Sequence, residues 1–308
     1  MENLRVKSYH LSKELCSICN PVIDNSLSEI KQRKIDDDIL IHTLRKRVKF
    51  LRTILKLVSN GIGEELYKKN NFILRDLNRR SALLRNFSAL IIICNDSINE
   101  DTDKSQPLKK LLPRLQSDFN KIKENIDYSA LFHQQEVTLH KVQTNLNKSK
   151  LIKLRFATIK SGLEKIFSDA SELLSISKKN PNESNLHEWR KSVKDLYHCI
   201  SVLSPIKPKI YNGYAKQLKQ LSDMLGELHD YFELQHYVES TDKQELDLEL
   251  INAHIERSKS MLSKKSFSLG KKLLKEKPDT FSSRFKKYYS IYKKNPKKSC
   301  RMTQQDNK

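Results

Sequence analysis

Four basic residues recur at the same spacing in two segments that lie about 145 residues apart in the chain. Residues 41–58 and residues 186–203 both contain the pattern His-x-x-Arg-Lys-x-x-Lys. At about 100° per residue, these positions fall within roughly a third of the circumference of a helix. Such a line of positive charge is unfavourable unless an anion lies along it. The positions are His42, Arg45, Lys46 and Lys49 in the first segment, and His187, Arg190, Lys191 and Lys194 in the second.

Both segments carry apolar residues on the arc opposite the basic positions, as an amphipathic helix does. Almost no acidic residue is interleaved in the first segment, so pairing one turn apart cannot neutralise its cations. Arg52 and Lys56 extend the first basic line. A solvated helix face is the usual explanation of a run of charge, but the repetition favours anion binding. The apolar positions are Leu44, Val48, Leu51 and Leu55, and Trp189, Val193, Leu196 and Ile200.

A second pair of segments repeats at nearly the same spacing. Residues 77–90 align with residues 221–234, and Arg75 aligns with Lys219. Two elements that repeat in register indicate a duplicated structural unit. The copies also differ at three functional positions, so the two halves are not expected to contribute equally to a site. Tyr197 stands in place of Arg52, His229 in place of Arg85, and Asp230 in place of Asn86.

The repeated pattern resembles the CHAD domain, the conserved-histidine α-helical domain. Residues 218–234 also resemble the Leu-Gly-x-x-x-Asp helix of that family, and the resemblance covers roughly residues 10–275. It implies an all-α fold of two tandem four-helix bundles related by a pseudo-twofold axis. It also implies that basic helix faces line a central groove or pore, and that this groove binds inorganic polyphosphate without catalysis.

The expected polyphosphate-binding residues come from both basic helices and from the long helices that follow them. Arginine can give paired hydrogen bonds to phosphate oxygens, lysine supplies a compact charge, and a neutral imidazole can donate one hydrogen bond. The expected set is His42, Arg45, Lys46, Lys49, Arg52, Lys56, Arg75, Arg79, Arg85, His187, Arg190, Lys191, Lys194, Lys216 and Lys219.

The composition independently favours a helical protein with a polyanionic partner. The chain has 308 residues, with 58 Lys and Arg against 37 Asp and Glu, which gives a net charge of +21. This excess suits nucleic acid, an anionic membrane or polyphosphate. Only 6 Gly and 8 Pro occur, which disfavours a turn-rich β fold. We expect no signal peptide and no membrane span, and scattered cysteines favour a reducing cytoplasm.

The hydrophobic periodicity predicts two similar sets of helices and a tail. The acidic run Asp36-Asp37-Asp38 is expected to cap the first basic helix. We expect a first bundle over residues 1–149, a second over 150–277, and a basic, largely disordered tail over 278–308. The predicted helices cover about 10–34, 39–59, 64–97, a stretch reaching 147 with a break near 125–129, 151–178, 185–203, 210–239 and 244–275.

Other motifs do not point to catalysis or to a metal. Cys16-x-x-Cys19 lacks a second cysteine pair, so two small buried residues on a helix explain it better than a metal site. The sequence contains no Walker motif, nucleophile elbow or glycine-rich phosphate loop. Nothing beside His42 or His187 supplies a nucleophile. We therefore expect no catalytic residue, no metal site and no cofactor.

Two rival functions remain open at this stage. The basic tail interleaves Phe281, Phe285, Tyr288, Tyr289 and Tyr292 with lysines, a composition that could bind single-stranded RNA by charge and stacking. The simpler reading is a solvated tail that attracts polyanions non-specifically. The second rival is a phosphohydrolase that acts on polyphosphate. The family resemblance also suggests an association with polyphosphate granules.

Overall fold

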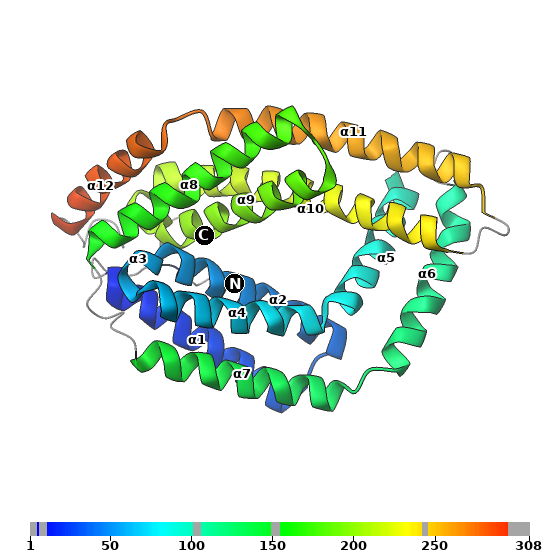
Figure 1. The fold of residues 1–308 in the computed structure, drawn as a ribbon, viewed down its shortest axis with the longest axis horizontal. Helices are drawn as coiled ribbons and strands as arrows, with labels where there is room; N and C mark the ends of the chain where they lie inside the picture. The colour runs from blue at the N-terminus through cyan, green and yellow to red at the C-terminus, as the bar shows by residue number, and fades with distance from the viewer. Residues whose placement is uncertain (1–4, 6–10, 101–105, 149–154, 242–245, 295–308) are drawn as a thin grey trace, which may run out of the picture.

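All regular structure in the described part of the chain is helical. The computed structural model describes Arg5 and residues 11–100, 106–148, 155–241 and 246–294 (Figure 1). The expected all-α class is therefore confirmed. The α-helices are α1 (Leu11–Gln32), α2 (Asp37–Leu57), α3 (Ser59–Ile62), α4 (Glu64–Arg80), α5 (Ala82–Glu100), α6 (Gln106–Glu124), α7 (Tyr128–Lys148), α8 (Phe156–Lys179), α9 (Glu183–Leu203), α10 (Pro208–Ser240), α11 (Leu248–Leu273) and α12 (Pro278–Lys294).

Each basic helix begins at a side-chain cap. The carboxylate of Asp36 accepts hydrogen bonds from the backbone N–H groups of Asp38, at 2.9 Å, and Ile39, at 3.3 Å. Asn182 accepts one from the backbone N–H of Asn185 at 2.9 Å before α9. These bonds satisfy donors that a helix start leaves without a partner. The capping role expected for the acidic run is confirmed, and it fixes where the basic positions of α2 begin.

Four helices of the first half pack side by side. Helix α2 lies between α1 and α4, and α7 contacts both α1 and α4 (Figure 1). The apolar arc of α2 is buried among them, including Leu40, Leu44 and Leu51. Cys19 of α1 is also buried, as expected for a small core residue, whereas the side chain of Cys16 lies outside the described residues.

The single long helix expected over 64–97 is wrong, because the chain breaks at Ser81. Helix α4 ends at Arg80 and α5 begins at Ala82. Beside this break, the guanidinium of Arg45 donates to the backbone carbonyl of Asn78 and, at 3.2 Å, to the hydroxyl of Ser81. Helices α5 and α6 then pack against each other, and they reach α10 and α11 of the second half.

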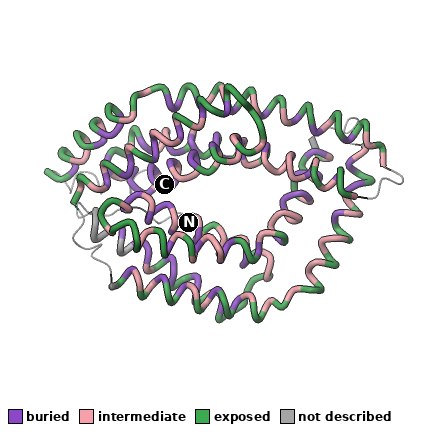
Figure 2. Tube along the Cα trace, viewed as in Figure 1, coloured by how far each residue is buried: buried purple, intermediate pink, exposed green. Residues whose placement is uncertain are grey.

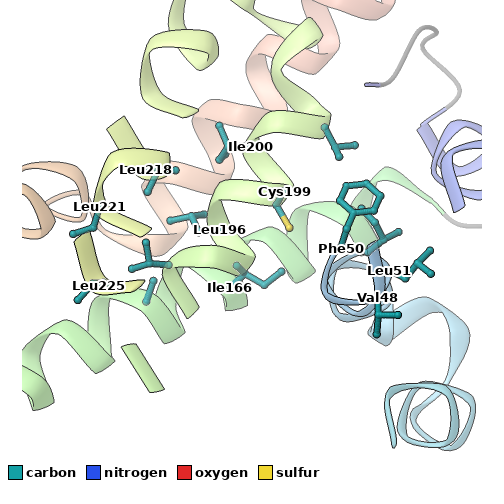
Figure 3. Close-up of a cluster of buried hydrophobic side chains, with 14 of the residues drawn as sticks. Val48, Phe50, Leu51, Ile166, Leu196, Cys199, Ile200, Leu218, Leu221 and Leu225 are labelled. Atoms are coloured by element: carbon teal, nitrogen blue, oxygen red, sulfur yellow. The ribbon is translucent and has the colours of Figure 1, made fainter. Parts of the chain in front are cut away.

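The second half is built around α9 and α10. Helix α9 packs against α8 and α10, and α11 lies along α10. One continuous buried cluster joins this half to the first. Figure 3 shows part of it, with Phe50 of α2 next to Cys199 of α9. Figure 2 shows that buried positions lie mainly on the sides of helices that face other helices. The basic faces of α2 and α9 are therefore held on packed helices.

The tail expected to be largely disordered is a packed helix over Pro278–Lys294. In α12, Phe281 and Phe285 are buried, and Phe281 stacks on Phe167 of α8 with 4.2 Å between ring centroids. Tyr289 stacks on Phe156 at 4.0 Å. The aromatic residues recur at helical spacing, and this apolar stripe outweighs the high lysine content. Residues 295–308 of the expected tail lie outside the described residues.

Helix α8 approaches the end of α2 at a glycine. A Cβ atom added at Gly162 would overlap the backbone carbonyl oxygen of Leu57, whereas one added at Gly213 of α10 would meet nothing within 4 Å. The absence of a side chain at Gly162 lets the two helix backbones come close where the halves of the chain meet.

We predict that Gly162→Ala destabilises the fold by about 3 kcal/mol, the upper end of the overpacking range, because a rigid backbone atom cannot move aside. The measurement is the free energy of unfolding in urea. Gly213→Ala is the matched control and should be neutral or stabilising by up to about 1 kcal/mol, because alanine favours the helix. Equal stabilities for the two variants would contradict the close approach.

Candidate anion-binding site

A large cavity lies between the two halves of the chain. Its volume is about 1250 Å³, and its walls are the basic faces of α2 and α9 together with parts of α4, α5, α8 and α10. Thirteen of the fifteen residues predicted from the sequence line it. They are His42, Arg45, Lys46, Lys49, Arg52, Lys56, Arg75, Arg79, Arg85, His187, Arg190, Lys191 and Lys194.

The other two predicted residues, Lys216 and Lys219, do not line the cavity. The contribution of α10 begins at Ser222, so both lysines lie before it, and both are exposed. Lys219 instead pairs with Asp223, with 2.6 Å between Nζ and Oδ2. Lys219 aligns with Arg75 in the sequence, but only the side chain of Arg75 lines the cavity.

Four cations of the cavity wall form no ion pair in the described residues and share the charge of one buried carboxylate, that of Asp230. Lys49, Arg85, Arg190 and Lys194 make no ion pair with a residue in the described part of the chain. Nε of Arg190 and one terminal nitrogen of Arg85 are also buried without a hydrogen-bond partner. These four side chains come from α2, α5 and α9, and they form what we call the central cation cluster.

The pKa values of the lysines reflect this crowding. Burial, followed by repulsion from Lys194 and Arg190, holds the pKa of Lys49 well below its ordinary value. Burial and then Arg190 lower the pKa of Lys194 to about 8. Both shifts mean that the surroundings disfavour the charged form. An anion in the cavity would reverse that penalty, so the site is electrostatically prepared for negative charge.

Other cations of the cavity wall already have partners. Nζ of Lys56 lies 3.1 Å from Asp169 and 3.2 Å from Asp195. Burial disfavours the charged form of Lys56, but the two carboxylates more than offset this, and its pKa is raised. Arg52 donates to the side chain of Asn71 at 2.8 Å, and Lys191 pairs with Glu188 at 2.7 Å.

The match with known sequences agrees with this arrangement. The family described as the CHAD domain matches residues 24–239, a span that includes both basic helices and most of α10. The chain belongs to the CHAD family. No curated protein and no solved structure matches it significantly. In the described residues, no helix of this CHAD protein has the length and apolar character needed to cross a membrane.

Histidines of the CHAD cavity are held in the neutral form. Burial, followed by the charge of Lys46, lowers the pKa of His42 to about 4. The pKa of His187 is also lowered, first by burial and then by Arg190. At neutral pH each ring therefore carries one N–H and can donate a single hydrogen bond. An anion nearby would favour the protonated form and add positive charge at the same positions.

Sequence reasoning missed several residues of the cavity wall. His198 lines the cavity, is only 5% exposed, and leaves Nε2 without a hydrogen-bond partner. Asp169 and Asp195 also line it. Asp195 directly follows the basic pattern in the sequence, but the sequence does not show that its carboxylate pairs with Lys56. Because Asp169 comes from α8, its pairing with Lys56 depends on a tertiary contact that local periodicity does not encode.

His198 makes a pH-dependent contribution to stability that can be measured. Burial, and then Lys194 and Lys49, lower its pKa to about 3, and the ring packs edge-on against Phe50. The unfolded chain binds a proton near pH 6.5, whereas the folded chain does not. Stability is therefore full above about pH 6.5 and falls as the pH drops toward the folded pKa.

We predict that His198→Phe removes on the order of 2 kcal/mol of the stability lost between pH 7 and pH 5, because phenylalanine does not titrate. Urea unfolding at the two pH values measures this. His140→Phe, at an exposed position of α7, is the control and should leave the pH dependence unchanged. If the free energy of unfolding falls equally between pH 7 and pH 5 in the His198 variant and the parent chain, the ring of His198 is not held in the neutral form.

Proposed function

We propose that this CHAD protein binds inorganic polyphosphate in the cavity between its two halves and does not cleave it. The observation that carries the proposal is the central cation cluster, in which four cations form no ion pair in the described residues and have only the buried carboxylate of Asp230 acting on all of them. The CHAD family is associated with polyphosphate binding, and the family match spans both helices that supply most of these cations.

The chemistry of the cavity suits a thin, unbranched polyanion. In polyphosphate a negative group recurs every few ångströms, so cations one helical turn apart can each meet an oxygen. The duplicated basic helices supply such spacing from two directions, because α2 and α9 both line the cavity. We propose that these faces act as pseudo-twofold related halves of one basic groove, inside two four-helix bundles. We also place the protein in the cytoplasm, with access to polyphosphate granules.

A nucleic acid is the weaker candidate. The aromatic residues that suggested base stacking are committed to packing, since Phe281, Phe285 and Tyr292 of α12 are buried. RNA is also bulkier than polyphosphate, and base recognition needs amide and aromatic groups that the basic faces lack. Titrations with long-chain polyphosphate and with RNA, at matched phosphate concentration and several salt concentrations, separate the two. Equal affinities for polyphosphate and RNA at every salt concentration would show that the protein attracts polyanions by charge alone.

We predict that replacing Lys46, Lys49 and Lys194 together by Gln weakens polyphosphate binding roughly 100-fold or more. Each charge-assisted contact is worth on the order of 1.5–3 kcal/mol, and 1.4 kcal/mol is tenfold in affinity. Fluorescence anisotropy at physiological salt measures the affinity. Circular dichroism should show an unchanged helix content, because these side chains lie away from the apolar arc.

The matched control removes the same charge elsewhere. Lys264, Lys265 and Lys272 are exposed on α11, which contributes nothing to the cavity wall. Their replacement by Gln should change the affinity by no more than about threefold, because salt screens distant charges. Removing residues 295–308 tests the end of the chain without removing α12. Equal losses in the cavity and control variants would assign binding to bulk charge.

We further predict that the protein releases no phosphate from polyphosphate or from nucleoside triphosphates, with or without added Mg²⁺ or Mn²⁺. Burial and the charge of Lys46 disfavour the protonated form of His42, so at neutral pH this ring has no proton to give as a general acid. A colorimetric phosphate assay over several hours measures turnover. Sustained phosphate release that disappears in both the His42→Ala and the His187→Ala proteins would contradict the proposal and identify the protein as a phosphohydrolase.

A further inference from the structure

Two carboxylates and an imidazole converge at one edge of the cavity. One ligand atom from each of Glu183, His229 and Glu233 lies within 4.8 Å of the others. Glu183 is the first residue of α9, and His229 and Glu233 are one turn apart on α10. Two rigid helices therefore bring together residues that are separated by almost 50 positions in the sequence.

The two helices contribute similar pairs. Helix α9 carries Glu183 and His187 four residues apart, and α10 carries His229 and Glu233 at the same spacing. The rings of His187 and His229 lie with their centroids 4.7 Å apart. The cluster thus has two imidazoles and two carboxylates facing each other across the contact between α9 and α10.

The two carboxylates of the cluster have an imidazole and an amide as existing partners. Glu183 contacts Nε2 of His236 at 2.8 Å, and Glu233 accepts a hydrogen bond from the side chain of Asn86 at 3.1 Å. In the described part of this chain, no lysine or arginine forms an ion pair with either carboxylate. Nδ1 of His229 is buried and has no hydrogen-bond partner. The imidazole of His236 is thus the group that offsets the charge of Glu183, and a bound cation would take over that role for both carboxylates.

We propose that Glu183, His229 and Glu233 bind a divalent transition-metal ion of the zinc type at the edge of the cavity. One imidazole nitrogen and two carboxylate oxygens are ligands that Zn²⁺ accepts at three of four positions. Water can take the fourth position, because the clustered ligands of the described residues do not include His187. The ion would offset the repulsion between the two carboxylates, and Nε2 of His229 lies 3.7 Å from Oε1 of Glu233. This site stands independently of polyphosphate binding.

The test is a calorimetric titration of Zn²⁺ alone into the full chain, with Co²⁺ absorption as a second readout. We expect one Zn²⁺ per chain. Glu183→Gln and Glu233→Gln should each weaken binding at least tenfold, because each removes a charged ligand of similar shape. Visible absorption of Co²⁺ should report nitrogen and oxygen ligands, without the thiolate bands that binding at a cysteine would give.

The matched control uses another Glu and His one turn apart. Glu136 and His140 of α7 lie 3.9 Å apart on the protein surface, without a second carboxylate described as facing them. Replacing both by Gln should leave the Zn²⁺ affinity unchanged. Absence of binding to the parent chain, or equal binding by the Glu183 and Glu233 variants, would overturn the metal site. Polyphosphate titrations in the presence of a chelator test the proposed function separately.

Discussion

Repulsion within the central cation cluster is the constraint on which the rest of the structure depends. Lys49, Arg190 and Lys194 can stay together only because packing fixes the helices that carry them. Each fully buried leucine, valine or tryptophan on the opposite arcs stabilises the fold by roughly 1.5–3 kcal/mol. Burial and repulsion oppose it at each cation, by about 3 kcal/mol at Lys194, whose pKa falls to about 8. The apolar arcs therefore outweigh the basic faces, and the cations remain available for an anion.

The distribution of acids around the cavity follows from the same constraint. Asp169 and Asp195 neutralise Lys56, and Glu188 pairs with Lys191, so charge is balanced toward the edges. The same pairing at the centre would cancel the attraction for a polyanion. Four cations from α2, α5 and α9 remain against the single buried carboxylate of Asp230, which leaves an excess of positive charge on the cavity wall.

The basic faces could be predicted because they depend on local periodicity. His42 to Lys56 and His187 to Lys194 each follow one helix, and their apolar arcs fixed the exposed side. The break at Ser81 could not be predicted in this way, because Arg45 stabilises it from another helix. The high lysine content of α12 led to the prediction of a disordered tail, although its aromatic residues recur at the spacing of a helix. The prediction that Lys219 lines the site was wrong, because alignment with Arg75 gives its position along a helix but does not show how far the cavity extends.

The break at Ser81 also explains why corresponding residues of the two copies, Arg85 and His229, make different contacts. It sends α5 across to the second half, where Asn86 donates to Glu233 and the hydroxyls of Ser97 and Tyr231 share a hydrogen bond of 2.9 Å. Arg85 of the first copy thereby joins Arg190 of the second in one cluster. Its counterpart His229 instead faces Glu233. The exchange of arginine for histidine between the copies thus gives the first copy a cation in the central cation cluster and the second an imidazole beside a carboxylate.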